Sequence, residues 1–231
     1  MRRKSHPNGA RTTRKRRGIG MTVKSIGILG TGKVGIVLAQ LALKAGYTVY
    51  IAGSSDPSKI ALTVKVLTPG AIAGAASDVA SKADVVILAL PLSKYQSIPK
   101  DKLKGKLVID AMNYWWEVDG KENDFVAPGS TSSETIQSFL SESRVVKAFS
   151  HMGYHDLYDE AKPAGKPDRK AIAVAGDNAS DVMIVSEIVN DLGFDPVQIG
   201  ALNTGVSLEP GGNAFGASED AKTLSRLINN H

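Results

Sequence analysis

Three glycines spaced as Gly30, Gly32 and Gly35 lie between a short apolar run and an apolar pattern with helical periodicity. A glycine at the first position permits a tight turn, one at the second lets the backbone approach a pyrophosphate, and one at the third lets the helix pack closely on a sheet. The start of such a helix offers unpaired N–H groups and the positive end of its dipole, which attract an anion. The pattern predicts the start of a dinucleotide-binding domain; the alternative is a glycine turn that binds nothing.

The hydrophobic pattern after this loop predicts strands and helices in alternation. The runs at 84–90, 106–110 and 144–149 are almost continuously apolar, which is typical of parallel strands covered on both faces. We therefore predict an α/β fold: a doubly wound, Rossmann-type, mostly parallel sheet with helices on both faces, in a single domain. Strands are predicted at 26–29, 47–52, 71–73, 84–90, 106–110, 144–149, 170–175 and 196–199, and helices at 34–44, 58–66, 77–82, 133–140 (capped by Ser132 or Ser133), 179–192 and 218–230.

Charge divides the chain into a basic N-terminal arm and a mildly acidic body. Residues 1–20 hold eight Lys or Arg and no acid, which leaves 20 bases and 23 acids in the rest of the 231 residues. We predict a disordered arm at 1–20, an NAD(P)-binding Rossmann domain at 21–205, and a C-terminal loop and helix at 206–231. The arm suits nucleic acid or an acidic membrane surface; the alternative, which we favour, is a start site that belongs at Met21.

The lack of cysteine and of long apolar runs limits the chemistry and the location. Without cysteine there is no disulfide, thiolate nucleophile or iron–sulfur cluster, so redox chemistry must come from a bound cofactor. No run approaches the ~18 apolar residues of a membrane span, and no charged start leads into an apolar signal core. We expect a soluble, cytoplasmic protein that acts on a small-molecule substrate, with neither membrane nor nucleic acid as a partner.

The residues after the second predicted strand indicate which dinucleotide is bound. An acid at the strand end hydrogen-bonds the adenine ribose of NAD, whereas small polar or basic groups accommodate the 2′-phosphate of NADP. Ser54 and Ser55 offer hydroxyl and amide donors there, and Lys59 adds charge. Asp56 is the opposing feature, since it either reaches the ribose or caps the helix that follows Pro57. We predict NADP, with NAD as the alternative.

Six segments, in this order, resemble the NADP-dependent oxidoreductases of the deazaflavin (coenzyme F420) type, whose dinucleotide domain is also similar to that of the STEAP metalloreductases. The resemblance covers most of residues 23–205. It implies NADP as the cofactor, deazaflavin F420 or flavin as a flat co-substrate, direct hydride transfer for which no general acid is obligatory, and a homodimer. The segments are 27–35, 52–55, 84–91, 108–113, 145–149 and 174–178.

The resemblance also assigns residues to the cofactor. It implies that residues 31–34 wrap the pyrophosphate, that Ser54 and Ser55 take the 2′-phosphate, and that Leu90 and Pro91 line the nicotinamide side. Family members often carry an arginine where this chain has Ser55, and Lys59 compensates for it only in part. The predicted cofactor-binding residues are Gly30, Thr31, Gly32, Lys33, Val34, Gly35, Ser54, Ser55, Lys59, Leu90, Pro91 and Ala148.

Three further features follow predicted strands, where loops of an open sheet contact ligands. The aromatic run at 113–116 either stacks on a flat acceptor or packs in a loop or a dimer interface. His151 and Asn113 are the candidate catalytic residues, His151 as a proton or hydrogen-bond donor to a substrate carbonyl. We predict no metal at His151 and His155, because Gly153 disfavours a regular helix and no third ligand is placed. The loop at 209–216 is expected to be a flexible lid or a segment swapped within a dimer.

These features together predict an NAD(P)H-dependent oxidoreductase, with NADPH exchanging hydride with a flat acceptor. The alternative is a non-catalytic NAD(P)-binding sensor or regulatory module, since the chain has no distinct acid–base constellation. A third class, a nucleic-acid-associated protein, depends entirely on residues 1–20.

Overall fold

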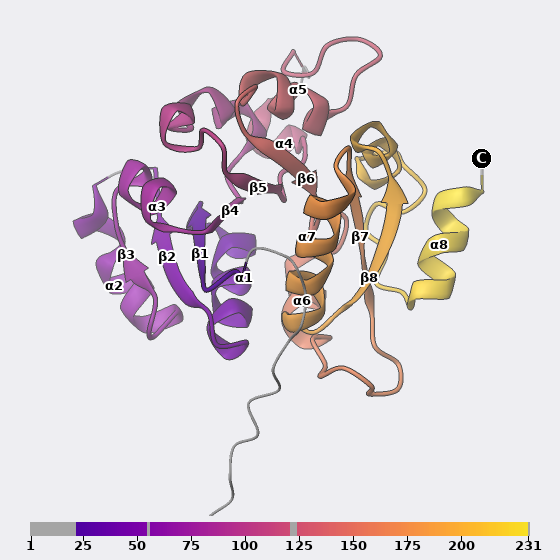
Figure 1. Cartoon of the computed structure of the whole chain (residues 1–231), viewed down its shortest axis with the longest axis horizontal. Helices are drawn as coiled ribbons and strands as arrows, with labels where there is room; N and C mark the ends of the chain where they lie inside the picture. Colours follow the sequence, from indigo (N-terminus) through magenta and orange to yellow (C-terminus); the bar gives the residue numbers. More distant parts are fainter. Residues whose placement is uncertain (1–21, 55, 121–123, 231) are drawn as a thin grey trace, which may run out of the picture.

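The strands form one twisted sheet, in which strand direction reverses once between neighbours (Figure 1). The computed structural model describes residues 22–54, 56–120 and 124–230. The strand order is β3-β2-β1-β4-β5-β6-β7-β8, and every neighbouring pair is parallel except β6 and β7, which are antiparallel. The strands are β1 (Ser25–Leu29), β2 (Thr48–Ala52), β3 (Ile72–Ala73), β4 (Val85–Leu88), β5 (Leu107–Asp110), β6 (Arg144–Lys147), β7 (Ala171–Gly176) and β8 (Asp195–Gly200).

Helices cover both faces of this sheet, which confirms the predicted α/β fold class. Alternate strand residues divide between two cores: Ile109 packs on one face and Val108 on the other. The first face is covered by α1 (Lys33–Lys44), α2 (Pro57–Leu67), α6 (Tyr154–Asp159) and α7 (Ala179–Asp191). The second face is covered by α3 (Ala76–Lys82), α5 (Ser132–Phe139), α8 (Ala221–Asn229) and the 3-10 helices η1 (Leu92–Ser97), η2 (Lys100–Lys102) and η3 (Leu202–Leu208).

The strand order creates a switch point between β1 and β4. The chain first builds outward from β1 to β3 and then returns to β4 on the other side, so the connections after β1 and β4 leave in opposite directions. A ligand crevice opens at such a point, beyond the carboxyl ends of the strands. Gly30 N donates to Ala52 O (2.8 Å) and Ala89 N donates to Leu29 O (2.8 Å), which fixes the glycine loop between the ends of β2 and β4.

Several local details differ from the sequence predictions. The cap of α5 is Thr131, not Ser132 or Ser133: its hydroxyl accepts from Glu134 N, while the carboxylate of Glu134 accepts from Thr131 N. The strand predicted at 144–149 ends at Lys147, and Phe149 adopts a φ of 63°. The short helices α4 (Trp116–Asp119) and α6 were not predicted; Gly153 precedes α6 as its cap and does not interrupt it.

The C-terminal segment packs on its own chain in this structure, and the lid or swapped segment expected at 209–216 stays a prediction. Ala214 is fully buried, and Gly216 N donates to His151 O (2.7 Å). Glu209 accepts hydrogen bonds from both the backbone and the hydroxyl of Ser132 (2.7 and 2.6 Å). Figure 1 shows α8 beside β8 at one end of the sheet, with β3 at the other. Residues 1–20, the predicted basic arm, lie outside the described residues.

Within the described ranges, no helix combines the length and the apolar character that crossing a membrane requires.

Candidate dinucleotide site

The glycine loop has two glycines that the chain itself requires and one that faces open space. A side chain at Gly30, which has a φ of 130°, would overlap the carbonyl of Ala89, and one at Gly35 would overlap the carbonyl of Gly30. A Cβ at Gly32 would meet no atom within 4 Å. Gly30 and Gly35 are thus explained by packing alone, whereas Gly32 leaves room for a group outside the chain.

The start of α1 beside this loop is suited to an anion. Gly32 is the N-cap residue and supplies no side chain to bond the first N–H groups, and the first turn contains no acid. Unpaired N–H groups and the helix dipole together give this end a partial positive charge. The loop therefore presents both the donors and the space that a pyrophosphate needs.

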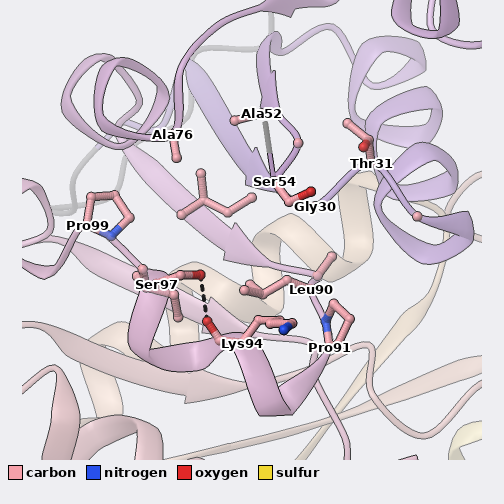
Figure 2. A pocket seen from close by; sticks show the side chains of 15 residues that line it. Gly30, Thr31, Ala52, Ser54, Ala76, Leu90, Pro91, Lys94, Ser97 and Pro99 are labelled. Atoms are coloured by element: carbon pink, nitrogen blue, oxygen red, sulfur yellow. Dashed lines mark hydrogen bonds between the residues drawn. The ribbon is translucent and has the colours of Figure 1, made fainter. Parts of the chain in front are cut away.

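A pocket of about 590 Å³ adjoins the glycine loop (Figure 2). It lies between the ends of β1 and β2 on one side and the segment after β4 on the other. Lys94 is its one charged lining residue among those the structure describes, and the lining includes no acid. The lining residues are Leu29, Gly30, Thr31, Gly32, Ala52, Gly53, Ser54, Ala76, Ala89, Leu90, Pro91, Lys94, Ser97, Ile98 and Pro99.

The pocket brings together half of the predicted cofactor residues. Gly30, Thr31, Gly32, Ser54, Leu90 and Pro91 line it. Of the others, Val34 and Gly35 belong to α1, Ala148 is fully buried beyond β6, and exposed Lys33 lies with its Nζ 4.8 Å from the ring centre of Tyr154. Lys59 is exposed on α2 outside the lining, and Ser55 lies outside the described residues.

The segment after β4 contributes residues that the sequence prediction missed. Lys94 and Ser97 come from η1, and Ile98 and Pro99 follow it. In the sequence these residues are marked only by their position, because they follow an apolar strand that neighbours the glycine loop across the switch point. No motif marks them, so only the strand order could have pointed to this loop.

Asp56 is engaged as a helix cap, which resolves the alternatives left open for it. Its carboxylate accepts from Ser58 N at the start of α2 (2.8 Å). The hydrogen bonds from Ser58 hold the pKa of the Asp56 carboxyl below its usual range. Asp56 does not belong to the residues that line the pocket.

His151 is a buried structural residue, which corrects the expectation that it lies in the crevice as a donor. Its side chain is 1% exposed, and its Nε2 accepts from Ala173 N (3.1 Å). Since a backbone N–H can only donate, the ring proton is on Nδ1, which donates to Ala217 O (3.2 Å). Burial lowers the pKa of His151 to about 4, so the imidazole is neutral and both nitrogens are occupied.

Asn113 joins three segments near the carboxyl ends of β5 and β6. Its Nδ2 donates to Ser150 O (3.0 Å) and to Leu208 O (2.9 Å), which fixes the orientation of the amide. The Oδ1 atom is buried without a hydrogen-bond partner among the described residues. Asn113 therefore links the loop after β6 to the end of η3, and its amide hydrogens are not available to a substrate.

A fully buried ion pair lies at the same edge of the sheet and was not predicted. Asp110 and Lys147 end β5 and β6 as register partners, with Lys147 Nζ 3.6 Å from Asp110 Oδ2. The ammonium also donates to Met112 O (3.1 Å) and Ser132 Oγ (3.2 Å), while Ser133 donates to Asp110. The network anchors the start of α5 to the ends of β5 and β6.

The aromatic run at 113–116 lies against the loop after β4. Asp119 accepts from Trp115 N and from Ser93 N, both at 2.8 Å, and so ties α4 to η1. The indole of Trp115 is 43% exposed and lies 6.3 Å from the ring of Phe215, while Trp116 is 55% exposed. Across the described residues, no group of three His, Cys, Asp or Glu side chains is arranged to hold a metal ion.

Comparison with known proteins finds one family in the region of the glycine loop. Residues 25–114 match the family described as NADP oxidoreductase, coenzyme F420-dependent. The chain is similar to the rat metalloreductase STEAP3, with 26% identity over 186 residues that make up 80% of this chain and 35% of STEAP3. It is also 36% identical to the Escherichia coli protein YjhV over 66 residues, or 29% of this chain and 48% of YjhV. The chain thus spans about a third to a half of these relatives.

Solved structures share the fold over most of the chain. A Sinorhizobium meliloti protein, SMa0349, superposes with a TM-score of 0.74 and 25% identity, covering 84% of this chain and 94% of its own. A protein of Arthrobacter sp. FB24, provisionally assigned as an F420-dependent NADP reductase, gives a TM-score of 0.67 and 25% identity, covering 79% and 87%. The resemblance expected from the sequence is therefore confirmed: residues 25–114 match the family of coenzyme F420-dependent NADP oxidoreductases, and the chain shares its Rossmann-type fold with the Arthrobacter protein.

Proposed function

We propose that this protein is an NADP-dependent oxidoreductase that exchanges hydride between NADPH and a flat acceptor such as deazaflavin F420 or flavin. The observation that carries the proposal is the pocket beside the glycine loop, which has an anion-binding helix start at one edge and no acid among its described lining residues. The matched family and the Arthrobacter relative support the same chemistry.

The residues of this chain fit a dinucleotide. Thr31 and Gly32 would hold the pyrophosphate against the start of α1, where Gly32 leaves open space. Ser54 and the neighbouring Ser55 would receive the adenosine ribose, with Lys59 on the adjoining helix. Leu90 and Pro91 would pack against the nicotinamide side and exclude water from it. When bound, the nicotinamide supplies or accepts the hydride; the protein aligns the two rings.

The preference for NADPH follows from where the acids are. An acid that bonds the ribose hydroxyls would repel a 2′-phosphate at the same position. Asp56 is the acid nearest in sequence to the end of β2, and its carboxylate accepts a hydrogen bond from Ser58 N. The described lining of the pocket would therefore offer a phosphate hydroxyls, backbone N–H groups and the ammonium of Lys94.

The acceptor side of the proposal rests on the aromatic loop. Asp119 holds Trp115 next to the loop after β4, and that loop carries Leu90 and Pro91. Exposed indole faces at this edge can stack on a flat ring system. We also propose that the protein forms a homodimer and works in the cytoplasm; light scattering of the purified chain tests the first point.

Titration of the full chain with NADPH and with NADH tests the cofactor. We expect NADPH to bind with a Kd well below about 1 mM and more tightly than NADH. Ser54→Asp should reverse the preference, because it places a carboxylate in the pocket. Binding of neither dinucleotide would refute the proposal.

Oxidation of NADPH in the presence of F420, flavin or a quinone then separates an enzyme from a binding module. Turnover with any of these acceptors supports an oxidoreductase. Tight binding without turnover by all three would favour a non-catalytic NADP sensor.

A further inference from the structure

We propose that Asn113 and Ser150 form the subsite for the carboxamide of the nicotinamide ring. The Oδ1 atom of Asn113 accepts from the amide NH2 group, and the hydroxyl of Ser150 donates to the amide carbonyl. This inference rests on the proposed function and extends it from the phosphates of the cofactor to its reacting ring. Both residues are binding residues, and neither is assigned a proton transfer.

Two buried oxygens beyond the ends of β5 and β6 have no hydrogen-bond partner among the described residues. They are Asn113 Oδ1 and Ser150 Oγ. Asn113 Nδ2 donates to Ser150 O (3.0 Å), so the amide lies against the residue that carries the second oxygen. Both residues are partly exposed, and the two side chains therefore still reach the surface. Leaving a buried polar atom unpaired is unfavourable, so a ligand that pairs it gains affinity.

The residue before Ser150 has a strained backbone. Phe149 adopts a φ of 63°, in the left-handed region that a bulky aromatic residue rarely occupies. Its side chain is 1% exposed and packs in the core on the first face of the sheet. Packing of the ring thus maintains the turn that directs the chain from β6 to Ser150. Backbone strain of this kind clusters at ligand sites, where the surrounding structure maintains it.

The two unpaired oxygens match a primary amide and not a carboxylate. Asn113 Oδ1 can only accept, because Nδ2 gives its hydrogens to Ser150 O and Leu208 O. The hydroxyl of Ser150 can donate. A primary carboxamide has a donor and an acceptor on one carbon, so it can pair with both residues. A carboxylate would place an oxygen against Asn113 Oδ1 with no hydrogen between them.

The order of the strands puts this subsite at the nicotinamide end of the cofactor. A dinucleotide with its ribose at the end of β2 and its pyrophosphate at the glycine loop continues past Pro91, after β4 (Figure 2). The strands that follow are β5 and β6, whose loops contain Asn113 and Ser150. Asp119 accepts from Ser93 N and Trp115 N, both at 2.8 Å, and so joins the loop after β4 to the loop after β5.

The decisive variant is Ser150→Ala, which removes a hydroxyl that bonds to no described residue. The matched control is Ser186→Ala, which removes a buried hydroxyl on α7 that donates to Val182 O. Calorimetry with the full chain and both variants gives the Kd of three probes. They are NADP, its nicotinic acid analogue, in which a carboxylate replaces the carboxamide, and 2′-phospho-ADP-ribose, which lacks the nicotinamide.

We expect Ser150→Ala to weaken NADP by about 2- to 10-fold, the loss of one neutral hydrogen bond, and to leave 2′-phospho-ADP-ribose unchanged. Its Tm should not fall, because no hydrogen bond to the chain is lost. Ser186→Ala should change the Kd of none of the probes.

The nicotinic acid analogue tests Asn113 without altering the loops that its amide joins. The unmodified chain should bind this analogue at least about tenfold more weakly than NADP, because a site built to accept a hydrogen bond rejects a group without the donor. The described lining of the pocket contains Lys94 and no acid, so its charge would favour the carboxylate. Weaker binding of the analogue would therefore report on Asn113 Oδ1.

Four results would overturn the inference. The first two are an unchanged affinity of Ser150→Ala for NADP and equal binding of NADP and the nicotinic acid analogue by the unmodified chain. The third is an equal loss for NADP and 2′-phospho-ADP-ribose, which would separate Ser150 from the nicotinamide. The fourth is a raised KM of Ser150→Ala for the flat acceptor with an unchanged Kd for NADP, which would assign the subsite to the acceptor. Failure of the unmodified chain to bind NADP would refute the proposed function itself, so the two failures are distinguishable.

Discussion

Lys147→Met tests the idea that a buried ion pair stabilises the ends of β5 and β6. Lys147 and Asp110 have fully buried side chains, and Lys147 Nζ satisfies both Met112 O and Ser132 Oγ. Methionine keeps an unbranched stem beside Gly205, where a Cβ would lie 2.8 Å from Lys147 Cδ. The substitution therefore removes the ammonium with little change of packing.

The expected cost follows from the charge left behind. After the substitution, Asp110 retains the hydroxyl of Ser133 and the N–H of Met112 but has lost its cation. Breaking a buried pair in this way costs about 3–5 kcal/mol. In a chain of this size, about 2–4 °C of Tm is lost per kcal/mol, so the Tm should fall by roughly 6–20 °C.

The control is an ion pair of similar geometry at the surface. Lys104 Nζ lies 3.0 Å from Glu142 Oε1, with the two side chains 51% and 65% exposed. Lys104→Met should leave the Tm almost unchanged, because exposed ion pairs contribute little to stability. Adding Asp110→Asn to Lys147→Met should recover part of the loss, because the unpaired carboxylate is then neutral.

Urea and thermal unfolding, followed by circular dichroism, give these free energies of unfolding. The reasoning would be refuted if Lys147→Met lost no more stability than Lys104→Met. It would also be refuted if Asp110→Asn added its full cost to Lys147→Met, since the two residues would then not be coupled.

The remaining predictions concern a titration, a glycine and a cap. The pKa of His151 is about 4 in the folded chain against 6.5 for the ordinary group, so on acidification the unfolded chain binds the proton first. Protonation of this residue should therefore leave the free energy of unfolding unchanged above pH 6.5 and lower it by about 3 kcal/mol at pH 4. Urea unfolding between pH 6.5 and pH 4 measures this loss of stability. The control His155→Gln, at an exposed position, should lose as much stability as the unmodified chain, and His151→Gln should lose less. Gly32→Ala should leave the Tm within about 2 °C but weaken NADPH binding at least tenfold by calorimetry, as its Cβ meets only the open space beside the loop. Thr131→Ala should cost about 1 kcal/mol in urea unfolding, because it removes one half of the capping box on α5.

Features set by local sequence were predictable, and those set by distant segments were not. The glycine loop and the apolar strands depend on residues that are close in the chain, so their fold class and order follow from pattern. The capping box was also local: Thr131 and Glu134 have the required spacing, which favours Thr131 over the serines chosen. The antiparallel β6–β7 pair depends on how the chain between them crosses the sheet, which no local pattern specifies.

The candidate site shows the same division at the level of single residues. His151 follows a strand, as a crevice residue would, but the carbonyl that binds its Nδ1 belongs to Ala217, 66 positions later. Lys94 has no motif, and its place in the pocket comes from the pairing of β4 with β1. Sequence position relative to a strand thus identifies the edge of the sheet, and only packing decides which side chains face the ligand.

The way polar groups are used at this edge bears on the kind of acceptor. His151, Asp110 and Lys147 are buried and bonded to the chain, and the amide hydrogens of Asn113 are taken by two carbonyls. Reducing a carbonyl or an imine requires a proton as well as a hydride, and a positioned donor speeds that step. Transfer between two stacked rings requires chiefly alignment and exclusion of water. These four residues hold loops in place, and Trp115 and Trp116 are exposed beside them, which favours a flat ring as the proposed acceptor.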